Sequence, residues 1–356
     1  MVGCLRTTKQ GSCSMKEVSI IGLDLAKNVF QIHGADVDDM PVVRRKLRRG
    51  EVLPFFAKLP ACLVGMEACG GSHYWAREIA ALGHDVRLIP PAYVKPFVKR
   101  GKTDAADAEA ICEAVSRKSM RFVPIKSADQ QATAMVLKVR DLLVRQQTQA
   151  TNALRAHLNE LGIIAATGVA KVSQLIAIVH DPADARIPTA ARFALTTLVG
   201  QIEALSNELK RLERAIVAMV KHDPDIQRLA TIPGVGAITA ASIKALVPDI
   251  GGFKSARHFA AWIGLTPKPH SSGGKERLGG ISKMGNPTLR KLLVLGGMGM
   301  LRRAKNNEVG LDWVRRLLMR RPGKVVAVAM ANKTARIAFA LLSKGEVYRK
   351  PAEMAA

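Results

Sequence analysis

Residues 18–33 read VSIIGLDLAKNVFQIH, and this stretch decides the fold of the first part of the chain. Val18 to Leu25 is a β-rich apolar run that is typical of a central strand. Val29 to His33 follows closely enough to be its hairpin partner. Asp24 stands near the end of the first run, where a carboxylate needs a structural or chemical reason.

Strands and helices alternate after this hairpin. A basic cluster, Arg44 to Arg49, is interpreted as solvated and is assigned no element. Ser72 is the predicted N-cap of its helix, and Thr103 can cap the last helix. The order predicts a mixed α/β sheet with helices on its faces. The predicted strands are Ala61 to Met66 and Val86 to Ile89, and the predicted helices are Glu51 to Leu59, Ser72 to Leu82 and Asp104 to about Ser116.

From about Ser127 the composition changes to helix formers, and residues 130–161 are predicted to form one long helix. A loop containing Pro182 and Pro188 follows. The next segment has the four-and-three spacing of a coiled-coil seam, although an ordinary core helix in a bundle is the alternative. Two such helices can pack on each other or on a second subunit. The seam residues are Leu198, Ile202, Leu205, Leu209, Leu212, Ile216 and Met219.

Residues 228–246, RLATIPGVGAITAASIKAL, resemble a helix-hairpin-helix. We expect the first helix to end at Ile232 and the second to start at Ala237. The turn containing Gly234 and Gly236 would then present free N–H groups to a DNA phosphate without reading sequence. A plain helix corner is the alternative. The last predicted helices are Leu289 to Arg303, Leu311 to Met319 and Lys324 to Leu342.

The charge of the chain predicts a polyanionic partner. The 356 residues include 54 Lys and Arg against 29 Asp and Glu, for a formal net charge of +25. The 5 cysteines form no C-x-x-C pair, which fits reduced thiols in the cytosol. We find no signal peptide and no charge-free apolar stretch of about 18 residues, so we expect a cytoplasmic protein without a membrane span.

Four acidic residues in three unlike contexts predict a site for divalent cations. Asp24 and Glu67 end neighbouring strands and can point to the same sheet edge, while Asp104 and Asp107 share one helix face. Magnesium prefers oxygen ligands, and two such ions clamp the attacking and leaving oxygens of a phosphodiester. Each acid alone has an ordinary explanation, such as complementing a helix dipole. Together they favour a site for Mg²⁺, or for Mn²⁺ in its place.

Residues 267–291, PKPHSSGGKERLGGISKMGNPTLRK, contain five glycines and are predicted to be a loop. Ser271 and Ser272 stand at its tip. A serine needs a base or an electrostatic trap to act as a nucleophile, and cations can stabilise charge on a phosphate. From the residues alone, a phosphate-contact loop without chemistry is favoured. The cations around the serines are Lys268, Lys275, Arg277, Lys283 and Arg290, with His270 beside them.

Five motifs in this order resemble the DEDD-type insertion-sequence transposases of the one-ten family and, within it, the eleven-eleven subgroup. They are IGLDLAKNVFQIHG, MEACGGSHYWAR, GKTDAADAEAI, IPGVGAITA and HSSGGKERLGGISKMGNPTLRK. The resemblance implies a ribonuclease-H-like domain of the Holliday-junction-resolvase (RuvC) type at 17–126. It also implies a helical coiled-coil region at 127–223 and a mainly helical transposase domain with a catalytic serine at 224–345. Residues 1–16 are then a disordered N-terminus and 346–356 a tail.

The same resemblance implies the roles of the site residues. Asp24, Glu67, Asp104 and Asp107 would bind Mg²⁺, and a serine would attack the DNA phosphate to form a covalent phosphoserine. Ser272, which directly precedes Gly273, is favoured over Ser271.

The resemblance also implies the partners of the chain. It implies a dimer or tetramer in which the acids of one subunit approach the serine of another, guided by a structured non-coding RNA that pairs with donor and target DNA. The expected activity is excision and insertion of a mobile element by phosphodiester strand transfer in the bacterial cytosol or nucleoid. A Holliday-junction endonuclease that uses water and a non-catalytic nucleic-acid-binding protein remain as alternatives.

Overall fold

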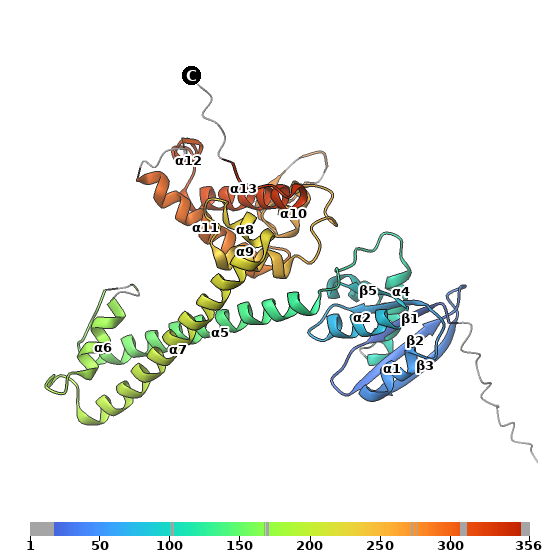
Figure 1. The fold of residues 1–356 in the computed structure, drawn as a ribbon, viewed down its shortest axis with the longest axis horizontal. Helices are drawn as coiled ribbons and strands as arrows, with labels where there is room; N and C mark the ends of the chain where they lie inside the picture. The colour runs from blue at the N-terminus through green and yellow to red at the C-terminus, as the bar shows by residue number, and fades with distance from the viewer. Residues whose placement is uncertain are drawn as a thin grey trace, which may run out of the picture. The chain divides into compact units, whose positions relative to one another are not determined.

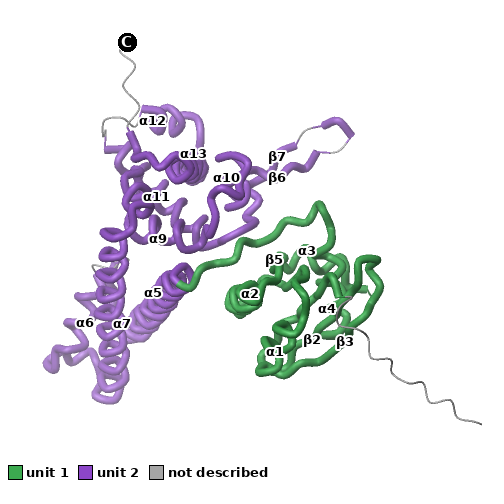
Figure 2. Tube along the Cα trace, turned by 45° about the vertical axis from the view of Figure 1, so that its right-hand side comes forward, with its two compact units in different colours: residues 1–128 green, residues 129–356 purple. Residues whose placement is uncertain are grey.

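The computed structural model of the chain forms two compact units, residues 1–128 and residues 129–356 (Figure 2). The predicted disordered N-terminus at 1–16 lies outside the described residues, as does most of the tail at 346–356. The structure describes residues 18–99, 101, 103–166, 168, 171–271, 273–275, 277–306 and 312–349.

The first unit is built on a five-stranded mixed sheet with the order β3-β2-β1-β4-β5 (Figure 1). β1 pairs antiparallel with β2 and parallel with β4, so it is the central strand. The predicted mixed α/β sheet is therefore confirmed, and it is consistent with a ribonuclease-H-like domain. The strands are β1 (Ile20–Asp24), β2 (Val29–Ala35), β3 (Pro41–Arg48), β4 (Leu63–Glu67) and β5 (Asp85–Ile89).

Helices cover both faces of this sheet, and side-chain alternation along the strands decides which residue faces which helix. Ile21 and Leu23 of β1 belong to a core that contains Trp75 and Ile79 of α2. Ile20 packs instead against the core of α4. The helical elements are η2 (Arg49–Glu51), α1 (Val52–Phe56), α2 (Ser72–Ala81), α3 (Pro91–Val94), η3 (Lys95–Phe97) and α4 (Asp104–Ser116).

Two details of the first unit differ from the sequence predictions. The basic cluster Arg44 to Arg49 lies mostly in β3, an edge strand, where Lys and Arg side chains oppose pairing with other chains. Ser72 is not an N-cap, because Gly71 holds that position. The Ser72 hydroxyl instead accepts from Cys69 N–H at 3.1 Å and donates to Cys69 C=O at 3.0 Å.

The second unit begins with two long helices, α5 (Ala128–Glu160) and α7 (Thr189–His222). They pack on each other through the Arg140–Glu213 ion pair at 2.5 Å and a Gln147–Ser206 hydrogen bond at 2.7 Å. A further helix, α6 (Val172–His180), stands in the connection, where the sequence predicted only a loop (Figure 1).

Alternate positions of the predicted α7 seam differ in burial. Ile202, Leu209 and Ile216 are buried at a spacing of seven residues, whereas Leu205 and Leu212 are half-buried. A coiled coil stays a prediction.

The rest of this unit is mainly helical, and one apolar helix lies at its centre. α13 has the length and hydropathy of a membrane-spanning helix. However, it packs against α10 and α11, and Ala331, Ala335 and Ala338 are fully buried, as in a core helix. The helices are α8 (Pro224–Ala230), α9 (Ala237–Leu246), α10 (Ala256–Trp262), α11 (Pro287–Lys305), α12 (Asp312–Leu318) and α13 (Gly323–Lys344).

The glycine-rich segment predicted to be a loop contains a short hairpin in the structure. β6 (Pro267–Pro269) pairs antiparallel with β7 (Leu278–Ile281), and the hairpin extends from the end of α10 (Figure 2). Prolines and glycines hide the strand signal in the sequence, because neither favours a strand interior.

Candidate active site

Strand register brings two of the four predicted acids to one edge of the sheet. β1 and β4 run parallel, with Gly22 level with Gly65 and Leu23 level with Met66. Asp24 and Glu67 are the next residues along, the last of β1 and of β4. Asp24 comes two residues after Gly22, and Glu67 comes two residues after Gly65. Because side chains alternate along a strand, each acid lies on the same face of the sheet as its glycine, and α4 covers that face.

Two glycines let α4 lie directly on that face. A Cβ atom at Gly22 would stand 2.1 Å from Ala108 O and 2.4 Å from Cys112 N, both in the backbone of α4. A Cβ atom at Gly65 would stand 2.7 Å from Val115 Cβ. Neither glycine was among the predicted site residues. The feature of the sequence that could have identified them is a glycine two positions before an acid on each of two strands.

The start of α4 supplies the other two acids. Thr103 has extended backbone, and its hydroxyl accepts from Ala106 N–H at 3.2 Å, so the predicted cap is confirmed. Asp104 and Asp107 occupy the first turn, where the helix dipole favours negative charge. Ala108, one turn after Asp104, is the residue that meets Gly22.

The four acids interact electrostatically. Partial burial, followed by the charges of Asp107, Asp104 and Glu67, raises the pKa of Asp24 from 3.8 to about 6. A carboxyl group responds in this way when burial disfavours its charge and other carboxylates lie nearby. Side chains from three separate segments of the chain therefore lie near enough at one end of the sheet for their charges to interact.

The donor set fits a divalent cation that prefers oxygen, because all four side chains are carboxylates. Within the described part of the chain, no three His, Cys, Asp or Glu side chains are close enough together to hold a metal ion. Like charges keep carboxylates apart, and a divalent cation offsets that repulsion. Binding at this cluster therefore requires the side chains to move toward the ion.

We expect Mg²⁺ or Mn²⁺ to stabilise the folded chain relative to buffer containing EDTA. Binding to the folded state alone adds about 1–3 kcal/mol at roughly 10 to 100 times the dissociation constant. Thermal unfolding followed by circular dichroism at pH 7.5 measures this shift. The matched control is the Asp104→Asn/Asp107→Asn double variant, which should lose most of it. An equal shift in both proteins would show that the cation binds elsewhere.

The predicted serine region lies in the second unit. Ser271 is exposed, and its Oγ accepts a hydrogen bond from Arg277 N–H at 3.3 Å, within the β6–β7 connection. Ser272 lies outside the described residues. Arg290 instead donates to Ile263 C=O and Met284 C=O, both at 2.9 Å, so its guanidinium helps to hold the base of the hairpin. The exposed cations in this region are Lys268, Lys275, Arg277 and Lys283.

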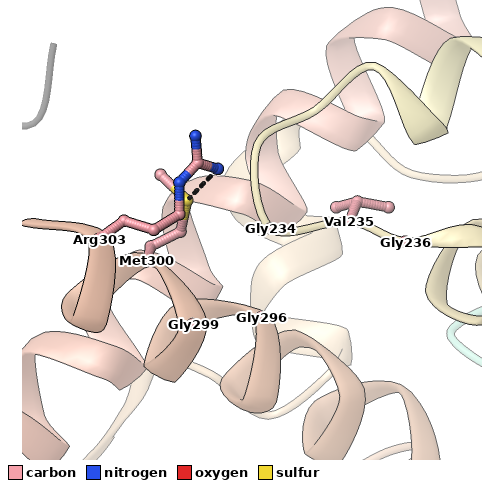
Figure 3. Close-up of a pocket in the computed structure, with 7 residues that line it drawn as sticks. All are labelled: Gly234, Val235, Gly236, Gly296, Gly299, Met300 and Arg303. Atoms are coloured by element: carbon pink, nitrogen blue, oxygen red, sulfur yellow. Dashed lines mark hydrogen bonds between the residues drawn. The ribbon is translucent and has the colours of Figure 1, made fainter. Parts of the chain in front are cut away.

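The turn between α8 and α9 packs on α11. Gly234 has a φ of 83°, and a Cβ atom at Gly296 would stand 2.2 Å from Gly234 O. A pocket of about 340 Å³ lies here between the turn and α11, with Arg303 at its edge (Figure 3). Gly234 and Gly236 were predicted from the sequence as part of this turn, but the α11 wall was not. The glycine-rich run within residues 296–299 is the sequence feature that could have indicated a helix surface open to close backbone packing.

Comparisons with known proteins agree across both units. Residues 21–163 match a DEDD transposase family of the IS110 type, and residues 226–310 match the Transposase IS116/IS110/IS902 family. A probable family 20 transposase of Pseudomonas aeruginosa is 49% identical over 334 residues, covering 93% of this chain and 99% of that protein.

Two further relatives cover nearly the whole chain. A putative transposase of Sinorhizobium fredii is 45% identical, covering 96% of this chain and 88% of that protein. The transposase for insertion sequence element IS1111A of Coxiella burnetii is 40% identical, covering 94% and 93% respectively. The chain therefore belongs to the IS110 family of DEDD transposases, enzymes that act on DNA to move insertion-sequence elements.

Proposed function

We propose that this transposase excises and inserts its element by strand exchange through a covalent phosphoserine. Asp24, Glu67, Asp104 and Asp107 hold Mg²⁺, or Mn²⁺ in its place, and a serine of the β6–β7 connection is the nucleophile. The observation that carries the proposal is the convergence of the acids, seen in the effect of three carboxylates on the pKa of Asp24. DEDD transposases as a family depend on divalent metal ions.

The reaction conserves the number of phosphodiester bonds. The serine oxygen attacks the DNA phosphorus and the P–O bond to the leaving DNA oxygen breaks, so a phosphoserine ester forms. The serine proton is transferred, in net terms, to the leaving oxygen, which is released as a DNA hydroxyl. A hydroxyl from the other DNA strand then attacks the phosphoserine, which joins the strands and frees the serine. Divalent ions held by the four acids would, when bound, supply Lewis-acid stabilisation of the charge that develops at the phosphate. The acids orient this assembly on a rigid sheet and helix.

Ser272 is the proposed nucleophile. It directly precedes Gly273, which has a φ of 57°. The hydrogen bond from Arg277 N–H to Ser271 Oγ supports a structural role for Ser271. Lys268, Lys275, Arg277 and Lys283 are proposed to hold DNA phosphates around the nucleophile, because exposed cations gain from releasing counterions.

The remaining assignments are also proposals. The turn at Gly234 and Gly236 is proposed to act as a helix-hairpin-helix on DNA phosphate, together with Arg290 at the hairpin base. The seam on α7 is proposed to form a coiled coil that assembles a dimer or tetramer, within domain limits of 17–126, 127–223 and 224–345. A structured non-coding RNA is proposed to guide target choice in the bacterial cytosol or nucleoid, and the net charge of +25 suits a protein that holds both RNA and DNA.

A covalent protein–DNA adduct tests the mechanism. The full chain, with its copurified RNA and Mg²⁺, is incubated with end-labelled DNA carrying the element and its flanks, then denatured. We expect labelled DNA to remain bound, and mass spectrometry to find phosphoserine at position 272. Ser272→Ala should abolish the adduct, and Ser271→Ala, the matched control, should retain it.

Two outcomes would reject the proposal in favour of a rival. Cleaved DNA without an adduct identifies a hydrolytic Holliday-junction type of endonuclease. DNA binding without metal-dependent cleavage, and unchanged by Asp104→Ala/Asp107→Ala, identifies a non-catalytic binding protein.

A further inference from the structure

A second pocket lies beside the acid cluster and is not used by any step of the proposed reaction. It has a volume of about 360 Å³, and its lining includes Leu25, Lys27, Arg49, Cys69, Tyr74 and Trp75. Leu25 directly follows Asp24, and Cys69 comes two residues after Glu67. The two loops that leave the acid-bearing strands therefore also form the pocket, within a single compact unit.

Trp75 fixes the shape of this pocket. The side chain is 5% exposed, and its ring meets Phe30 edge-on with centroids 5.0 Å apart. The guanidinium of Arg49 lies 5.0 Å from the centre of the Trp75 ring. The Arg49 backbone N–H donates to Asn28 C=O at 2.9 Å, which ties η2 to the loop after β1. The walls are thus connected to one another, as in a preformed binding site.

Tyr74 and two cations give the pocket its chemistry. Tyr74 is 42% exposed, and it touches the edge of Trp75 with ring centroids 5.3 Å apart. Among the described residues, no ion pair joins Lys27 or Arg49 to a carboxylate, and both side chains are exposed. An aromatic ring that bases can stack on, together with free positive charge, is the combination that binds single-stranded nucleic acid.

We propose that this pocket binds one nucleotide of the DNA strand adjacent to the phosphate at the acid cluster, with its base on Tyr74 and its phosphate held by Lys27 and Arg49. The proposal rests on the proposed function, in which that cluster holds a DNA phosphate. A volume near the lower end of the usual ~300–1,000 Å³ suits one nucleotide rather than a larger ligand. The base must leave its stack to enter, so the strand is unpaired at this point.

A photo-cross-link tests the pocket without using the cleavage reaction. The full chain is mixed, in EDTA, with an oligodeoxythymidine of roughly 12 nucleotides that carries one 5-iododeoxyuridine, and is then irradiated. We expect the cross-linked peptide of the first unit to contain Tyr74. Tyr74→Ala should lower that yield at least about fivefold to tenfold, because stacking contributes ~1–3 kcal/mol per base. Tyr74→Phe should retain it.

Matched variants separate the pocket from general DNA binding. Tyr93→Ala removes a tyrosine of α3 that is 44% exposed and should leave the Tyr74 cross-link unchanged. Lys27→Ala and Arg49→Ala should each lower the yield and its salt dependence, whereas Arg45→Ala on β3 should not.

Three outcomes would overturn the assignment or separate it from the proposed mechanism. A cross-link elsewhere in the first unit, or one unaffected by Tyr74→Ala, rejects the pocket. A clearly higher yield from iodouridine-labelled oligouridine than from the DNA probe rejects DNA in favour of RNA. Loss of the phosphoserine adduct with an intact Tyr74 cross-link rejects the serine mechanism and leaves the pocket supported.

Discussion

Asp24→Asn is expected to abolish strand exchange while making the folded chain more stable in metal-free buffer. The substitution removes one carboxylate from a cluster that already holds three others. We expect the rate to fall by roughly 10²–10³-fold or more, as when a group that stabilises transition-state charge is lost. Opposite effects on activity and stability are the mark of a site in which like charges are held together for function.

The stability effect depends on pH in a defined direction. Because the pKa of Asp24 rises from 3.8 to about 6 on folding, the folded state binds more protons between these values. The free energy of unfolding therefore falls as pH increases through this window. The full pKa shift corresponds to ~3 kcal/mol, but solvent screens a half-exposed group. Above pH 6 we therefore expect Asp24→Asn to be more stable than the parent chain by about 1–2 kcal/mol. Below about pH 4 the Asp24 carboxyl is protonated in both the folded and the unfolded state, so the parent chain and Asp24→Asn should have the same free energy of unfolding.

Urea unfolding of both proteins in EDTA, at pH 7.5 and at pH 4, measures this difference. Asp85→Asn is the matched control, because Asp85 is an exposed carboxylate on the same sheet and pairs with Arg87 at 2.6 Å. That variant should be slightly less stable than the parent at pH 7.5, or unchanged. Destabilisation by Asp24→Asn at pH 7.5 would contradict the electrostatic description of the cluster.

The sequence was sufficient to predict the elements with a strong apolar pattern. β1, β4 and α4 were found because buried strands and a capped helix leave local signals. Asp24 and Glu67 were placed at one sheet edge because they end neighbouring strands, and both do end such strands in the structure. A shared metal site of the four acids stays a prediction.

The missed features depend on neighbours that are distant in sequence or on weak local signals. β3 carries cations on an edge, and the β6–β7 hairpin is built from proline and glycine, so neither shows an apolar alternation. The pocket at Tyr74 needs three segments to meet, and no single one shows it. The same is true of the contact between Gly22 and α4, which only the folded sheet reveals.

Gly22→Ala is expected to lower both stability and activity, although the substitution changes no charge and no predicted ligand. Its Cβ atom would stand 2.1 Å from Ala108 O and 2.4 Å from Cys112 N. Both atoms belong to the backbone of α4, so no side-chain rotation relieves the contact and the helix must move. Overpacking of this kind costs about 3 kcal/mol. A shift of the helix also displaces Asp104 and Asp107, and a misplacement of about 1 Å costs roughly 10²-fold in rate.

Two comparisons show whether displacement of α4 is the cause. Gly34→Ala on β2 places its Cβ atom no closer than 3.3 Å to any neighbour and should retain most activity and stability. Gly65→Ala meets Val115 Cβ at 2.7 Å and its two Cγ atoms at 3.0 and 3.1 Å, so Val115→Gly, which removes all three atoms, should partly rescue it. No side-chain truncation should rescue Gly22→Ala in the same way. If Gly22→Ala keeps both its unfolding midpoint and its Mg²⁺-dependent stabilisation, then the close packing of α4 on β1 does not position the acids.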